Sequence, residues 1–247
     1  MELFDLCKEK MEDWTLFVPT KENFIQEGTY GSIHKFRNYA IKVPNIANAH
    51  PSYVLHEIDL WKDLDHPNII RYITHFIRPS AKHMIPFVVM EYASDKDLFE
   101  YLGNTNVFFK TFVQIFAAVA YLHDLDIVHL DLKLENILVM EDQVTVKLCD
   151  FGNAAKLTGH IEFKNGGSAQ YQCPEWKYPQ ILTKAMDIWS LGVMMYVFLH
   201  QQYPVFPDPP MNAVPDAIVP LLKQMWDPVP ACRPTAKECL DVFRQNL

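Results

Sequence analysis

The sequence predicts an α+β fold in two parts, a small antiparallel sheet with one main helix followed by a larger, mostly helical part. Short alternating apolar stretches broken by turns run through residues 24–43, which is typical of antiparallel strands. Longer stretches with apolar residues at helical spacing, at 108–123 and 187–200, dominate the second half. With 247 residues, of which 49% are apolar, the chain can bury a large core within one domain.

The charge and the cysteines narrow the class of protein. The net charge is −8 and neither end carries a block of lysine or arginine, so we expect no nucleic-acid partner and no membrane partner. The longest apolar stretch, residues 191–199, is far shorter than the roughly 20 residues that span a bilayer. Five scattered cysteines without paired spacing indicate reduced thiols. We therefore expect an intracellular protein, cytoplasmic or nuclear.

The first part of the chain predicts strands on either side of one helix. A mixed-charge lead-in to about residue 20 is expected to form a helical or irregular arm. The helix at 52–64 begins after Pro51 and carries Glu57 on the face of its apolar stripe, where a carboxylate needs a cation. Taken alone, Glu57 could equally lie exposed at the margin of the stripe. Further strands are expected at 69–76 and 86–91.

The second part predicts helices and one hairpin. Apolar runs at 137–139 and 144–148, separated by the polar turn 141–143, are typical of two paired strands. The proline-dense run 203–215 cannot hold a regular helix. Helices are expected to begin at 97–99 and to cover 108–123, 187–200 and 218–226.

Polar side chains gather at one edge of the predicted hairpin. Asp131, Lys133 and Asn136 fall within six residues before it, and Asp150 follows its second strand. A carboxylate and an amide oxygen suit Mg²⁺, a hard cation that prefers oxygen ligands. A second carboxylate and a lysine suit a hydroxyl nucleophile that attacks a phosphate. The spacing therefore predicts a site for phosphoryl chemistry.

The motifs around this hairpin resemble those of eukaryotic-type protein kinases. HLDLKLEN, from His129, is similar to the family's H-R-D-L-x-x-x-N catalytic loop, and residues 150–152 are its D-F-G. Further matches follow in order over residues 24–245: the loop QEGTYGSI, the strand AIK, the helix DIWSLGV, the triplet CPE and the element CRPT. The sequence is thus identified as a member of the serine/threonine protein kinases. It is a minimal single-domain form, with compact loops similar to those of viral kinases.

The resemblance implies the fold and the domain. It implies a two-lobed protein kinase fold over residues 1–247, with a small antiparallel β N-lobe at 1–91 that has one main helix. A hinge at 92–97 and a larger, mostly helical C-lobe at 98–247 complete it. The implied cofactors are ATP and Mg²⁺.

The resemblance also implies the catalytic groups. Asp131 would accept the proton of the substrate hydroxyl, and Lys133 would neutralise the γ-phosphoryl group. Asn136 and Asp150 would hold Mg²⁺. In the same reading Asp187 braces the catalytic loop, and the remaining structural pair is Glu175 with Arg233.

For the nucleotide, the resemblance implies a set of residues around the predicted cleft between the lobes. Lys42, clamped by Glu57, would orient the phosphates. The glycine-rich loop would approach the phosphates with its backbone, although Gln26 replaces the family's first glycine. The other implied nucleotide contacts are Ile25, Gly28, Gly31, Ile33, Ala40, Glu91, Ala93 and Leu138.

The implied substrate is a protein, bound by a monomeric enzyme. Lys133 and the stretch around Ser168 indicate serine or threonine as the target, and Asp97 and Glu135 lie where related enzymes read basic residues. Leu130 replaces the arginine that binds an activating phosphate, so we expect that phosphorylation of Thr158, or of another residue of that loop, is not the on-switch.

Gln26 and Leu130 also motivate the alternative, a pseudokinase that acts as a nucleotide-binding or protein-binding scaffold. A phosphotransferase for small molecules is less favoured, because such enzymes lack the CPE and CRPT elements.

Overall fold

The fold is that of a computed structural model, which describes residues 14, 16–28, 31–45, 50–80, 84–93, 96–158, 166–177 and 182–247. The chain divides into two units. Unit 1 comprises Met1–Asp65 and Ile70–Ala93, and unit 2 comprises His66–Ile69 and Ser94–Leu247.

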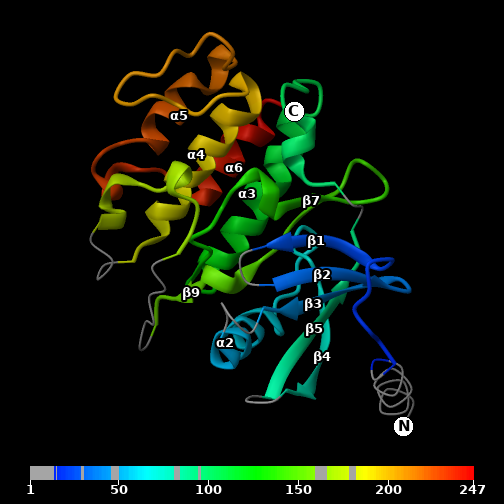
Figure 1. Ribbon diagram of the computed structural model, residues 1–247. Helices are drawn as coiled ribbons and strands as arrows, with labels where there is room; N and C mark the ends of the chain where they lie inside the picture. The colour runs from blue at the N-terminus through cyan, green and yellow to red at the C-terminus, as the bar shows by residue number, and fades with distance from the viewer. Residues whose placement is uncertain are drawn as a thin grey trace. The chain divides into compact units, whose positions relative to one another are not determined.

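Unit 1 contains a five-stranded antiparallel sheet in the order β1-β2-β3-β5-β4, drawn in blue to blue-green in Figure 1. The alternation of apolar residues predicts this kind of sheet, because successive side chains of a strand point to opposite faces. Arg37 adopts a left-handed conformation, with φ of 58°, in the predicted turn between β2 and β3. The strands are β1 (Phe24–Gly28), β2 (Gly31–Phe36), β3 (Tyr39–Pro44), β4 (Tyr72–Pro79) and β5 (Met84–Glu91).

The expected strand at 69–76 is wrong at its start. β4 begins at Tyr72, and Ile69 instead forms an isolated parallel bridge to Leu148 within unit 2. The backbone of Ile69 is therefore paired outside the sheet, although its side chain is as apolar and buried as those of a strand.

The helix of unit 1 is α2 (Pro51–Trp61), which begins at the predicted proline and ends at Trp61 rather than at residue 64. The ring Nδ1 of His50 caps it by accepting a hydrogen bond from the backbone N–H of Ser52, at 3.3 Å. At the other end, the indole of Trp61 donates to the carbonyl oxygen of Ile70 at 2.6 Å. These contacts fix the helix at both ends.

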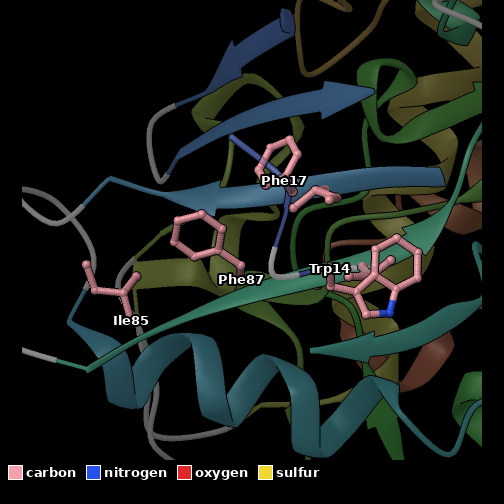
Figure 2. Close-up of a cluster of buried hydrophobic side chains, with 6 residues drawn as sticks. Trp14, Phe17, Ile85 and Phe87 are labelled. Carbon is pink, nitrogen blue, oxygen red and sulfur yellow. The ribbon is translucent and has the colours of Figure 1, made fainter. Parts of the chain in front are cut away.

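One face of the sheet is covered by the segment that precedes β1. Trp14 and Phe17 are buried there and pack with Ile41, Ile85, Phe87 and Val89 in one apolar cluster, shown in Figure 2. The Phe17 ring lies 6.4 Å from that of Phe87, in an edge arrangement. The lead-in that the sequence predicts as an arm therefore supplies part of the core.

Unit 2 is built around α4 (Lys184–His200), which is buried along nearly its whole length as predicted for a central helix. Aromatic rings fill the core around it, and the rings of Phe112 and Phe198 lie 5.8 Å apart. The other helices are α3 (Phe108–Asp124), α5 (Val219–Met225) and α6 (Ala236–Arg244).

Two small two-stranded sheets complete unit 2. The predicted hairpin pairs β7 (Ile137–Val139) with β8 (Val146–Leu148), and the flanking strands β6 (Ile127–Val128) and β9 (Ala155–Lys156) form the other antiparallel pair. The expected helix at 97–99 is a short 3₁₀ helix, Leu98–Tyr101, which the carboxylate of Asp97 caps by accepting from the N–H of Phe99. The proline-dense run 203–215 contains no helix, as predicted. Among the helices of the described residues, none has the length and apolar character to cross a membrane.

Candidate active site

The loop between β6 and β7 carries Asp131, whose carboxylate is 7% exposed and surrounded by donors. Its Oδ1 accepts hydrogen bonds from the backbone N–H of Ser168, at 3.0 Å, and from the Ser168 hydroxyl, at 3.2 Å. The ammonium of Lys133 lies 3.4 Å from Oδ2 and donates to the Ser168 hydroxyl at 3.1 Å. The structure thus brings Asp131, Lys133 and Ser168 into one hydrogen-bonded group.

Asp187 of α4 holds the loop that carries Asp131, so its predicted bracing role is confirmed. Its two carboxylate oxygens accept from the backbone N–H groups of His129 and Leu130, each at 2.9 Å. Burial alone would raise the pKa of Asp187, but hydrogen bonds from His123 and from the loop hold that pKa below its ordinary value. Leu130 itself is buried and has a left-handed backbone, with φ of 63°. The loop is therefore held in a strained shape by a buried charge.

His123 is a contributor that the sequence did not reveal. Its Nε2 lies 2.9 Å from Oδ2 of Asp187, and both side chains are almost completely buried. In the sequence, His123 lies only at the end of an apolar helical stretch, 64 residues before Asp187. No local pattern signals such a pair.

The register of the β7–β8 hairpin brings the backbones of Asn136 and Asp150 close together. Ile137 pairs with Leu148, and the N–H of Cys149 donates to the carbonyl oxygen of Asn136 at 2.9 Å, so Asp150 follows directly. The side-chain Nδ2 of Asn136 donates to the carbonyl oxygen of Asp131 at 2.8 Å. Because its nitrogen is fixed there, the amide oxygen of Asn136 is the atom left to meet a cation.

A metal at this position would depend on few protein ligands. Within the described ranges, no cluster of three or more His, Cys, Asp or Glu side chains has the arrangement of a metal site. One carboxylate and one amide oxygen do fit Mg²⁺, which keeps several waters and takes its other ligands from phosphates.

In unit 1, Lys42 and Glu57 form the predicted ion pair. The Lys42 ammonium donates to Oε1 of Glu57 at 2.7 Å, and the two side chains are 13% and 4% exposed. Glu57 is therefore not the exposed residue that the helical stripe alone allowed. Lys42 comes from β3 and Glu57 from α2, so the pair also ties this helix to the sheet.

The sheet register places part of the expected nucleotide set on the face that carries Lys42. Ile33 of β2 and Val88 of β5 pair directly with Lys42, and Ala40 lies two residues away on the same face. Ile25 falls in the irregular step between Phe24 and Gln26, where the β1–β2 register shifts. Ile33, Ala40 and Lys42 are thus brought together, whereas Ile25 has no place in the regular register.

The two glycines of the expected loop differ. A side chain at Gly31 would overlap the carbonyl oxygen of Val43, so glycine is required there by the close approach of β3. At Gly28 an added Cβ would make only an ordinary contact, at 3.8 Å from the oxygen of Gly31. Thr29 and Tyr30, at the tip of this loop, lie outside the described residues.

At the end of β5, Glu91 already has partners within unit 1. Its N–H donates to the carbonyl oxygen of Arg71 at 3.0 Å, and its Oε1 accepts from the N–H of Arg71 at 2.6 Å. Ala93 is buried. Leu138, the last expected nucleotide contact, belongs to unit 2, where it bridges to Asp97.

Asp97 and Glu135 lie close together in unit 2 and form an acidic pair. Burial raises the pKa of Asp97, and the charges of Glu135 and Glu100 add to this shift. The buried Oε2 of Glu135 has no hydrogen-bond partner within the described part of the chain. Such a pair of acids favours the approach of a cation.

The predicted partnership of Glu175 with Arg233 is confirmed. The two groups meet through two contacts, of which the one between Nη2 and Oε2 measures 2.9 Å. Arg233 also donates to the carbonyl oxygens of Ala185 and Asp227, each at 2.9 Å, and lies over the ring of Trp189. The contacts join three separate segments of unit 2.

Comparison with known proteins supports the same family as the motifs. A family model described as the protein kinase domain matches residues 20–242. The serine/threonine-protein kinase SRK2F of Arabidopsis thaliana is 37% identical over 179 residues, which cover 69% of this chain and 50% of that protein. Serine/threonine-protein kinase 33 of Bos taurus is 33% identical over 258 residues, covering 87% of this chain and 52% of that protein.

A third relative is the cytokinesis protein sepH of Emericella nidulans, which is 32% identical over 201 residues. That match covers 76% of this chain and 15% of the relative. The chain therefore spans about half the length of these curated relatives, or less.

Proposed function

The chain belongs to the protein kinase family, and we propose that it is an ATP- and Mg²⁺-dependent serine/threonine protein kinase. It would transfer the γ-phosphoryl group of ATP to a protein hydroxyl. The observation that carries this proposal is the hydrogen-bonded group of Asp131, Lys133 and Ser168, held in place by Asp187.

Phosphoryl transfer depends mainly on positioning and on the neutralisation of charge. Asp131 is the proton acceptor for the substrate hydroxyl, because its carboxylate is buried and its orientation is fixed by Ser168 and Asn136. Lys133 lies beside it and places a positive charge where the transferred group becomes most negative. Ser168 keeps both side chains in register, which makes it a positioning residue.

Asn136 and Asp150 are the residues that would hold Mg²⁺, which neutralises phosphate charge when it is bound. Lys42 is proposed for the ATP phosphates, since Glu57 fixes its ammonium on the sheet face. Ile33 and Ala40 on that face, with Leu138, are the proposed apolar contacts of the base, and Glu91 and Ala93 its backbone contacts. Ile25, Gly28 and Gly31 remain proposed contacts of the glycine-rich loop.

The proposed substrate is a protein segment with basic residues near the target hydroxyl. Asp97 and the unpartnered carboxylate oxygen of Glu135 support this, because a guanidinium would supply the donors that Glu135 lacks. The monomeric state stays a prediction. The pseudokinase alternative is not indicated by the comparisons, and the Lys42–Glu57 pair, which degenerate members often lose, is intact.

The direct test mixes the purified protein with labelled ATP, Mg²⁺ and a generic protein substrate. We expect incorporation into serine or threonine, and a loss of roughly 10²-fold or more for Asp131→Asn, which removes the proton acceptor but keeps the size of the side chain. Nucleotide binding is measured alongside for both proteins. A wild-type protein that binds ATP but transfers no phosphoryl group under these conditions would support the pseudokinase alternative instead.

A further inference from the structure

A cavity of about 600 Å³ lies in unit 2, next to the hydrogen-bonded group of the candidate active site. Residues 169–177 form much of its wall, and Trp189 of α4 and Phe206 of the proline-dense run line it as well. The proposed function does not assign a ligand to this cavity.

The wall of the cavity starts at Ala169, which directly follows Ser168, and the Ser168 hydroxyl donates a hydrogen bond to Asp131. Successive Cα atoms are about 3.8 Å apart. A polypeptide with its serine at Asp131 would therefore pass the cavity within a few residues of that serine.

The cavity wall carries a positive charge, although the protein as a whole is acidic. The whole chain carries −8, yet among the described residues that line the cavity Lys177 is the only charged one, and none is acidic. The Lys177 side chain is exposed, and its ammonium makes no ion pair with any residue that the structure describes. The neighbouring acid, Glu175, is bound to Arg233.

Cys173 adds no negative charge to the wall, because burial and the adjacent Glu175 raise the pKa of its thiol to about 12. The amide of Gln172 donates to the carbonyl oxygens of Gly166 and Gly167, at 3.3 and 3.4 Å. The wall therefore combines one cation, neutral polar groups and aromatic rings.

Trp189 provides a second, independent observation. Its side chain is 95% buried, and its indole N–H, like those of Trp14 and Trp226, has no hydrogen-bond acceptor among the described residues. Buried indole N–H groups normally find an acceptor. A ligand that brings an oxygen into the cavity can supply one, and a carboxylate offers two.

We propose that this cavity recognises an acidic side chain of the protein substrate, glutamate or aspartate, close in sequence to the target hydroxyl. The inference rests on the proposed function for the identity of its ligand as a substrate. Together with Asp97 and Glu135, it predicts a target in which basic residues and an acidic residue flank the serine or threonine at different positions.

Binding of labelled peptides tests the proposal without requiring catalysis. Fluorescein-labelled peptides carry arginines and a central serine in an alanine background, with Glu, Gln, Leu or Lys placed at each neighbouring position in turn. Fluorescence anisotropy gives Kd for each. At one position, we expect Glu to bind roughly three- to tenfold tighter than Lys, in line with the strength of a partly exposed ion pair, and tighter than Gln or Leu.

The variants assign the effect to this cavity. Lys177→Glu should reverse the preference at that position, and Lys177→Met should remove it. Lys237→Glu makes the same charge change on an exposed face of α6 and should leave the preference unchanged. The indole ¹H–¹⁵N resonance of Trp189, assigned with Trp189→Phe, should shift with the Glu peptide and not with the Leu peptide.

Equal binding of Glu and Lys at every position, or no binding at all, overturns the proposal, and so does a Leu peptide that binds best. If the protein phosphorylates substrates but shows no such preference, the inference about the cavity is rejected and the proposed function stands. If it shows the preference in binding but transfers no phosphate, the proposed function is rejected.

Discussion

At the residue scale, the candidate site relies on charges whose partners are fixed before any ligand binds. Asp131 is held by Ser168, and Glu57 by Lys42, so each carboxylate already has a donor in place. Preorganised charges of this kind need little rearrangement when charge develops on a reacting group. The same burial makes each pair sensitive to the loss of one partner.

The Lys42–Glu57 pair separates stability from activity. Lys42→Met takes the ammonium away from the buried carboxylate of Glu57, which should lower the free energy of unfolding by about 3 kcal/mol in urea titrations. The double variant Lys42→Met/Glu57→Gln removes the buried negative charge as well and should recover most of this loss. Phosphoryl transfer should be lost in both, since neither has the ammonium. Recovery of activity in the double variant would contradict the proposed role of Lys42.

The spacing of residues within one segment could be predicted from the sequence, and partners from distant segments only in part. Asp131, Lys133 and Asn136 lie within one loop, so their convergence follows from local chain geometry. Ser168 and Asp187 were found because they lie in motifs of the family. His123 was missed, because a buried histidine in an apolar helical stretch has no feature that distinguishes it from a core residue.

At the scale of elements, one hairpin and one helix position the candidate site of unit 2. The register of β7 and β8 pairs the backbone of Asn136 with that of Cys149, the residue before Asp150. α4 contributes the only side chain that holds two successive backbone N–H groups of the catalytic loop in the described structure, that of Asp187. The loop therefore depends on a helix more than fifty residues away in the chain.

Asp187→Asn should show this dependence through pH. Because the folded-state pKa of Asp187 lies below its ordinary value, its ionised form stabilises the fold above about pH 4. At neutral pH the free energy of unfolding of the variant should be about 1–3 kcal/mol lower than that of wild type. The reason is that the amide nitrogen of asparagine would face an N–H donor, where a carboxylate oxygen of Asp187 accepts a hydrogen bond. The difference from wild type should narrow as pH falls through the lowered pKa, because protonation then removes the same charge. Urea titrations at a series of pH values measure this difference in free energy of unfolding. A difference that stays constant down to about pH 3 would contradict the stabilising role of the ionised Asp187 carboxylate.

At the scale of the whole molecule, the α+β fold and most of its elements could be predicted from periodicity. The predictions failed where tertiary contacts decide. Ile69 has the composition of a strand residue, yet its backbone pairs with Leu148 in unit 2. Trp14 and Phe17 lie in a mixed-charge stretch without a strand or helix period, so their burial follows only from the apolar sheet face that they cover.

That covering segment gives the last prediction. Phe17 is fully buried, its ring packs against Phe36 and Phe87, and its carbonyl oxygen accepts a hydrogen bond from Arg78. Phe17→Ala should lower the free energy of unfolding by about 3–5 kcal/mol, because it removes a core ring and leaves a cavity. Leu16→Ala, one residue earlier, is the matched control, since Leu16 is 69% exposed and its loss should change stability by less than about 0.5 kcal/mol. Urea unfolding of the full chain compares the two. Equal effects would mean that the segment before β1 does not belong to the core of unit 1, and the apolar face of the sheet would then need another cover.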